Sequence, residues 1–153
     1  MKLFLDSCYL AYLRYAADDR IADYVTSLLR HATDMQAELV TNMIAIDEAV
    51  WLLVKKYGVP QEEVFELVNR LLPLLSIVPL DSEDYASMKQ TMLTYSLRPS
   101  DSLHIASVKK SQATYLVSED KDFDKIPTIK RLWLDVRARQ GSSHLPGDLG
   151  KPA

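Results

Sequence analysis

The sequence has 153 residues, of which 48% are hydrophobic and 25% charged, and these values are ordinary for a single globular domain. Apolar runs are far shorter than the roughly 20 residues of a membrane span, and the N-terminus reaches a charge too early for a secretory signal. The single cysteine, Cys8, excludes an internal disulfide and a thiolate zinc site, so a cytoplasmic protein that binds no membrane is expected. The net charge of −3 argues against a general nucleic-acid binder, unless several acids share a cation site.

Short apolar stretches alternate along the chain with segments of helical periodicity. Ser7 and Pro60 are typical of helix starts, and Gly58 is typical of a helix end. The predicted strands cover residues 2–6, 38–41, 76–80, 114–118 and 131–136. The predicted helices cover residues 7–15, 18–31, 43–57, 60–72, 82–97 and 101–110.

This alternation predicts an α/β fold. Its central sheet would have four or five mostly parallel strands, with helices on both faces to give three layers. The folded domain is expected over residues 1–136. Residues 137–153 contain three of the four glycines and are expected to form a flexible tail.

Four acidic residues lie near places where ligands bind in parallel sheets, beyond the carboxyl ends of the strands. Asp6 ends the first predicted strand, and Asp120 follows the fourth. Asp101 lies in the first turn of a predicted helix, whereas Glu48 lies on an apolar helix face, where an unpaired charge would be costly. Together they would supply the oxygen ligands that Mg²⁺ and Mn²⁺ prefer.

Each of these acids also has a simpler interpretation. Asp6 and Asp101 are well placed to cap a helix or to stabilise its N-terminus. Asp47 could be the inward residue in place of Glu48, and segment 118–124, with four acids, could be a solvated loop. Spacing alone leaves these alternatives open.

Four short segments place an acid in a similar order and context to a known family. They are Leu-Phe-Leu-Asp-Ser at 3–7, Thr41 followed by Glu48, Arg-Pro-Ser-Asp-Ser-Leu-His-Ile-Ala at 98–106, and Leu-Val-Ser-Glu-Asp-Lys-Asp-Phe at 116–123. These segments resemble the four acidic segments of the PIN-domain family, and especially of its VapC-type toxin ribonucleases. The resemblance spans residues 2–136.

The resemblance implies a PIN-like three-layer sandwich that hydrolyses RNA phosphodiester bonds as an endoribonuclease, with a metal-activated water. It implies that Mg²⁺ or Mn²⁺ is held by four ligands, namely Asp6, Glu48, Asp101 and Asp120. Asp122 is a further candidate ligand that the sequence does not separate from Asp120, and Ser118 would support the fourth acid by a hydrogen bond.

The resemblance also implies a biological role and partners. The chain would be the toxin of a type II toxin–antitoxin pair, inhibited by a VapB-like antitoxin. The apolar surplus on the predicted helices 43–57 and 61–72 adds support for a homodimer. The alternatives are an RNA-processing PIN nuclease without an antitoxin and a non-catalytic protein-binding module. An aspartyl phosphotransferase is disfavoured, because such enzymes usually carry a second acid where this sequence has Cys8.

Other residues have less specific interpretations. Trp51 and Trp133 are expected in the core, because apolar residues surround both in the sequence. His104 lies one helical turn after Asp101, and a packed or capping role is favoured over a role in the site. Three basic residues are candidates for contacts with RNA phosphates, although a solvated rim explains them equally well: Arg14, Arg98 and Lys121.

Overall fold

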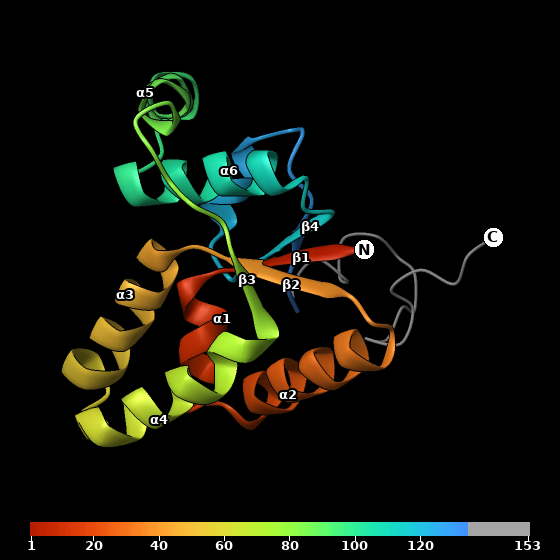
Figure 1. Cartoon of the computed structure of the whole chain (residues 1–153), viewed down its shortest axis with the longest axis vertical. Coiled ribbons are helices and arrows are strands. Elements are labelled where there is room, and N and C mark those ends of the chain that lie inside the picture. Colours follow the sequence, from red (N-terminus) through yellow and green to blue (C-terminus); the bar gives the residue numbers. More distant parts are fainter. Residues whose placement is uncertain (135–153) are drawn as a thin grey trace.

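The computed structural model of the protein describes residues 1–134. In this part of the chain, five strands form one sheet in the order β3-β2-β1-β4-β5, and all neighbouring strands are parallel (Figure 1). The strands are β1 (Lys2–Leu5), β2 (Glu38–Thr41), β3 (Leu75–Ile77), β4 (Tyr115–Val117) and β5 (Arg131–Leu132). The predicted parallel sheet of four or five strands is confirmed.

Helices cover both faces of this sheet and complete the three layers. Figure 1 shows α1 to α4 on one side of the sheet, with α6 on the other side and α5 outside α6. The helices are α1 (Ser7–Tyr12), α2 (Asp19–Asp34), α3 (Met43–Trp51), α4 (Gln61–Leu71), α5 (Asp84–Tyr95) and α6 (Pro99–Ser111).

The two apolar layers follow from the alternation of side chains along the strands. In β1, Leu3 and Leu5 belong to the core that packs under α1 to α4, whereas Phe4 belongs to the core that packs under α6. In β2, Leu39 and Val40 divide in the same way. Because both faces are covered, successive residues in the middle of these strands are apolar, as expected for a parallel sheet.

Three helices begin at a residue whose side chain caps the helix N-terminus. The carboxylates of Asp6 and Asp18 accept backbone N–H groups at the starts of α1 and α2, and the Asn42 carbonyl does the same for α3. Such caps satisfy N–H groups that the helix itself leaves without partners. Asp6 and Asn42 directly follow the carboxyl ends of β1 and β2, so these caps also bring polar groups to that edge of the sheet.

Several predicted element boundaries are wrong. The predicted helix 43–57 is α-helical only to Trp51 and continues as a π-helical turn, Leu52–Lys56. The predicted strand 76–80 begins and ends earlier, at Leu75–Ile77. β5 ends at Leu132 and pairs with β4 at two positions. Residues 135 and 136 of that predicted strand, and the predicted tail at 137–153, lie outside the described residues.

Among the helices of residues 1–134, none combines the length and the hydropathy that would allow it to cross a membrane.

Candidate functional site

The four predicted acids lie around one cleft at the carboxyl edge of the sheet. Asp6 follows β1, Asp120 follows β4, Glu48 lies on α3, and Asp101 lies in the first turn of α6. All four line a cleft of about 410 Å³ together with the side chain of Arg98. In a parallel sheet this edge is where ligands bind, because the loops and helix N-termini that follow the strands meet there.

Asp6 is buried, and its carboxylate is held by hydrogen bonds on both oxygens. Oδ1 accepts from the backbone N–H of Ser7 at 2.7 Å, and Oδ2 accepts from the hydroxyl of Ser118 at 2.6 Å. The thiol of Cys8 lies 3.7 Å from Oδ2. With only 6% of the residue exposed, the carboxylate has a fixed direction.

Ser118 links the first acid to the fourth. Its hydroxyl oxygen also accepts from the backbone N–H of Asp120 at 3.1 Å. The buried guanidinium of Arg131, on β5, donates to the carbonyl of Ser118 at 3.0 Å and forms two hydrogen bonds with Asp124. The short loop after β4 is therefore fastened at both ends, which supports the hydrogen-bonding role predicted for Ser118.

Glu48 and Asp6 both lie close to Nε2 of the buried His104 ring. Nε2 of His104 lies 2.9 Å from Oε2 of Glu48 and 3.6 Å from Oδ1 of Asp6. One ligand atom from each of these three residues lies within 4.8 Å of the others. Burial acts to raise the pKa of Glu48, but hydrogen bonds from His104, Ser100 and Ser7 lower this pKa overall. Burial lowers the pKa of His104, whereas Glu48 and Asp6 raise it by a larger amount.

The other two acids share an arginine. Arg98 donates from Nε to Oδ2 of Asp101 at 2.8 Å, and its guanidinium lies 3.6 Å from Oδ2 of Asp120. The arginine side chain is 72% exposed, whereas that of Asp101 is 7% exposed. Burial raises the pKa of Asp101 and nearby carboxylates add to this rise, although Arg98 lowers it in part.

Asp120 and Asp122, which the sequence does not separate, occupy different places. Asp120 lines the cleft, whereas Asp122 is exposed and pairs with Lys125 at 2.9 Å. Asp122 contributes its backbone N–H to Oδ1 of Asp120 at 2.9 Å. Asp47, the alternative to Glu48, also lies at the cleft but is exposed.

The other predicted residues are divided between the cleft and its surroundings. The prediction that Trp51 lies in the core is wrong, since it lines the cleft with 59% of its surface exposed. Trp133 is buried in the core, as predicted. Arg14 pairs with Glu63 outside the lining of the cleft, and Lys121 is exposed at the start of a short 3₁₀ helix, Lys121–Lys125.

The sequence favoured a packed or capping role for His104 over a role in the site and gave no prediction for Asn42, yet His104 contacts two of the acids and Asn42 contacts His104. His104 is fully buried and bonded to Glu48, and Asn42 lies behind it. The spacing of three residues after Asp101 was the available signal for His104. Asn42 had the weaker signal of a polar residue between a strand and an apolar helix.

The donor set fits a hard divalent cation. Its atoms are carboxylate oxygens, which Mg²⁺ and Mn²⁺ prefer, and two of these carboxylates converge within 4.8 Å. The fold and the cleft thus define an α/β domain with an acidic site, whose donor atoms suit a divalent cation, at the carboxyl edge of a parallel sheet.

Comparisons with known proteins give this class a family. Residues 3–129 match the model of the PIN domain, and the chain belongs to the PIN-domain family. No curated protein matches the sequence.

Several solved structures share the fold at low identity. VapBC2 from Rickettsia felis, bound to a DNA fragment from its promoter, matches with a TM-score of 0.62 and 15% identity over 86% of this chain and 98% of that one. VapC20 from Mycobacterium tuberculosis, a toxin that cleaves the sarcin–ricin loop, matches with a TM-score of 0.63 and 15% identity over 80% of this chain and 92% of that one. FitAcB from Neisseria gonorrhoeae matches with a TM-score of 0.57 and 18% identity over 86% of this chain and 96% of that one.

Proposed function

We propose that this protein is a metal-dependent endoribonuclease that acts in the cytoplasm. PIN domains are a family of metal-dependent ribonucleases. The observation that carries the proposal is that Asp6, Glu48, Asp101 and Asp120 line one cleft, with Asp6 and Glu48 close enough to share a cation. Without a cation, two carboxylates about 4 Å apart repel by about 1–4 kcal/mol, depending on the local dielectric. Such a cluster is reasonable mainly as a cation site.

The proposed roles follow from the contacts of each residue. The four carboxylates would hold Mg²⁺ or Mn²⁺, which when bound activates a water and stabilises negative charge on the phosphate. Ser118 fixes Asp6 and the backbone of Asp120. Arg98 is the cation of the cleft best placed to contact an RNA phosphate, because its side chain is 72% exposed and its planar group suits phosphate oxygens.

RNA cleavage with and without metal tests the proposal. We expect cleavage of structured or single-stranded RNA with Mg²⁺ or Mn²⁺, and none with a chelator. Asp6→Asn should abolish cleavage, since losing several kcal/mol of charge stabilisation corresponds to about a thousandfold or more in rate. The variant should melt at or slightly above the wild-type temperature without metal, because one charge leaves a crowded acidic cluster. A variant that melts normally and cuts at the wild-type rate would exclude Asp6 as a ligand.

We further propose that the chain is a toxin inhibited by a small VapB-like antitoxin. The matched structures include toxin–antitoxin complexes such as VapBC2 and FitAcB, which supports this role over RNA processing. If the wild type cleaves no RNA under any metal condition, the non-catalytic binding module becomes the better interpretation. If the chain is such a toxin, its expression should inhibit growth, and co-expression of a neighbouring small gene should restore growth.

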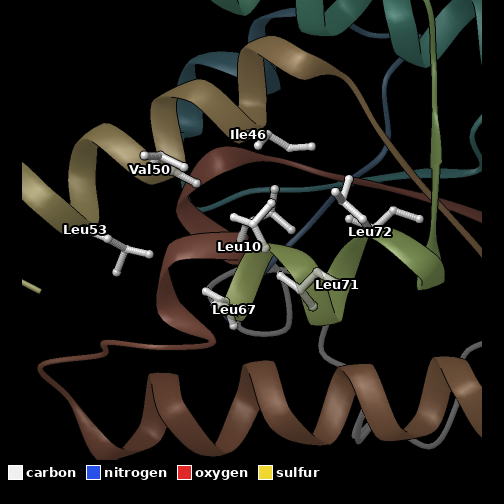
Figure 2. A pocket seen from close by; sticks show the side chains of 10 residues that line it. Leu10, Ile46, Val50, Leu53, Leu67, Leu71 and Leu72 are labelled. Atoms are coloured by element: carbon white, nitrogen blue, oxygen red, sulfur yellow. The ribbon is translucent and has the colours of Figure 1, made fainter. Parts of the chain in front are cut away.

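A homodimer through α3 and α4 is part of the same proposal. Figure 2 shows aliphatic side chains from α1, α3 and α4 that surround an apolar pocket, and Met43, Phe65 and Leu74 are exposed on or beside these helices. Burying exposed apolar surface is the main driving force of association. Light scattering should give twice the monomer mass at micromolar concentration, and a monomer at high micromolar concentration would contradict it.

A further inference from the structure

His104 lies directly behind the two acids that converge most closely. Its Nε2 is 2.9 Å from Oε2 of Glu48, and its Nδ1 is 3.2 Å from Nδ2 of Asn42. Both His104 and Asn42 are fully buried. Nε2 also lies within 4.8 Å of a carboxylate oxygen of Asp6. By distance alone, His104 could be either a third metal ligand or a hydrogen-bond donor to the acids.

The amide of Asn42 distinguishes these two roles, because its orientation is fixed. Oδ1 accepts from the backbone N–H of Ala45 at 2.9 Å as the cap of α3, and a backbone N–H can only donate. The amide nitrogen must therefore face the other way, where it lies 2.8 Å from Oγ of Ser107 and 3.2 Å from Nδ1 of His104. Since this nitrogen only donates, Nδ1 must accept, and the ring hydrogen is on Nε2.

We propose that His104 is a positioning residue for the metal site and not one of its ligands. Asn42 holds the ring in the tautomer with hydrogen on Nε2, and that hydrogen is donated to Glu48. A nitrogen that carries hydrogen in this way has no lone pair for a cation, so the ligand set contains only oxygen. This set suits Mg²⁺ and Mn²⁺ and disfavours Zn²⁺, which binds nitrogen and sulfur well. The inference rests on the proposed function in taking Asp6 and Glu48 as ligands.

The same contacts join both helices that carry acids. Asn42 caps α3, which carries Glu48, and it also bonds to His104 and Ser107 on α6, which carries Asp101. The ring of His104 also packs against that of Phe4 in β1, with centroids 5.8 Å apart. The direction of Glu48 is therefore fixed by buried groups of three elements.

Nuclear magnetic resonance tests the tautomer without any need for activity. Long-range ¹H–¹⁵N correlations of the metal-free protein, labelled on its histidines, distinguish hydrogen on Nε2 from hydrogen on Nδ1, and His104→Gln assigns the signal. We expect hydrogen on Nε2 alone, and we expect it to remain when Mg²⁺ is added. Hydrogen on Nδ1 in the metal-free protein, or loss of the Nε2 hydrogen on adding Mg²⁺, would overturn the proposal.

Mn²⁺ affinity, measured by electron paramagnetic resonance, tests the positioning role. His104→Leu should weaken binding by about 10–100-fold, the usual cost of losing a hydrogen bond to a metal-binding side chain. His104→Gln should stay within a few-fold of the wild type, because its amide nitrogen can donate to Glu48. His31→Leu, on the partly buried face of α2, is the matched control and should leave affinity unchanged.

These results separate the inference from the proposed function. If His104→Leu binds Mn²⁺ as tightly as the wild type in a folded protein, the positioning role is wrong, whatever the nuclease assay shows. If the tautomer and both affinities are as expected but no RNA is cleaved, the metal site stands and the nuclease function fails. A thermal melt of each variant confirms that the affinities refer to folded protein.

Discussion

The two halves of the acidic cleft are held in different ways. Asp6 and Glu48 are fixed by uncharged or buried partners: Ser118 donates to Asp6 at 2.6 Å, and the fully buried His104 bonds Glu48 at 2.9 Å. Asp101 and Asp120 instead share one guanidinium, that of Arg98, whose side chain is 72% exposed. The first half is held rigidly by buried groups, and the second is held by an exposed cation.

The difference indicates that the two halves of the cleft are prepared for a cation to different extents. Hydrogen bonds from buried donors orient a carboxylate without occupying the space in front of it, so the Asp6 and Glu48 half is organised before a cation arrives. A guanidinium between two carboxylates is itself a positive charge where a divalent cation would bind. If Asp101 and Asp120 bind a cation as proposed, we expect Arg98 to turn outward, and the exposure of its side chain keeps the energetic cost of this movement small.

The largest effect is expected from Ser118→Ala, in the rigid half. The change leaves Oδ2 of the buried Asp6 with only the weak thiol donor of Cys8, and it leaves the N–H of Asp120 without its acceptor. Mn²⁺ affinity should fall by about 10–100-fold, and the free energy of unfolding should fall by about 1–3 kcal/mol. Calorimetric titration and denaturant unfolding measure the two quantities, and Ser111→Ala, which removes a hydroxyl that bonds only to carbonyls of its own helix, is the control. Unchanged affinity would mean that Asp6 needs no orientation.

A smaller effect, of opposite sign, is expected from Arg98→Gln. Removing a competing cation should tighten Mn²⁺ binding by about fivefold, which corresponds to about 1 kcal/mol, the upper end for an exposed ion pair. Arg20→Gln, which removes an exposed pair with Asp18 at the start of α2, is the matched control and should not change the affinity. Weaker binding in Arg98→Gln would show that the arginine organises the second half and does not compete there.

The smallest effect is expected from Asp122→Asn. Its carboxylate pairs with Lys125 outside the cleft, and its contact with Asp120 uses the backbone N–H, which the variant retains. Mn²⁺ affinity should therefore stay within about twofold, as for an exposed ion pair of little energy. Asp120→Asn, measured beside it, should weaken binding far more. Equal losses in the two variants would make Asp122 a ligand after all.

Much of the fold was predictable from the sequence, because strand alternation and helical periodicity are local signals. The parallel sheet and its two covered faces followed from the apolar runs around Phe4 and Val40. The placement of Asp6 and Asp120 at the carboxyl edge was predictable from the rule that ligands bind there, whereas the choice of Glu48 over Asp47 depended on the resemblance to the PIN-domain family.

The remaining features depend on partners far apart in the chain. The bond from Asn42 to His104 joins residues 62 positions apart, and no periodicity encodes such a pair. Trp51 has apolar neighbours in the sequence but is 59% exposed, because it lines the cleft and is not packed in the core. The ion pair between Arg98 and Asp120 was likewise not predictable from the sequence, since it depends on the approach of Asp120 to α6.

The bond between Asp6 and Ser118 spans 112 positions, and this has a consequence for the timing of synthesis. Ribosomes add about 5–20 residues per second, and N-terminal parts emerge first. β1 is therefore made on the order of ten seconds before β4, its neighbour in the sheet. During that interval the nascent chain has its first acid but neither the donor that orients it nor the fourth acid. We expect a chain still attached to the ribosome to lack the complete acidic cleft until β4 has emerged, so that the proposed nuclease could act only after nearly the whole domain has been made.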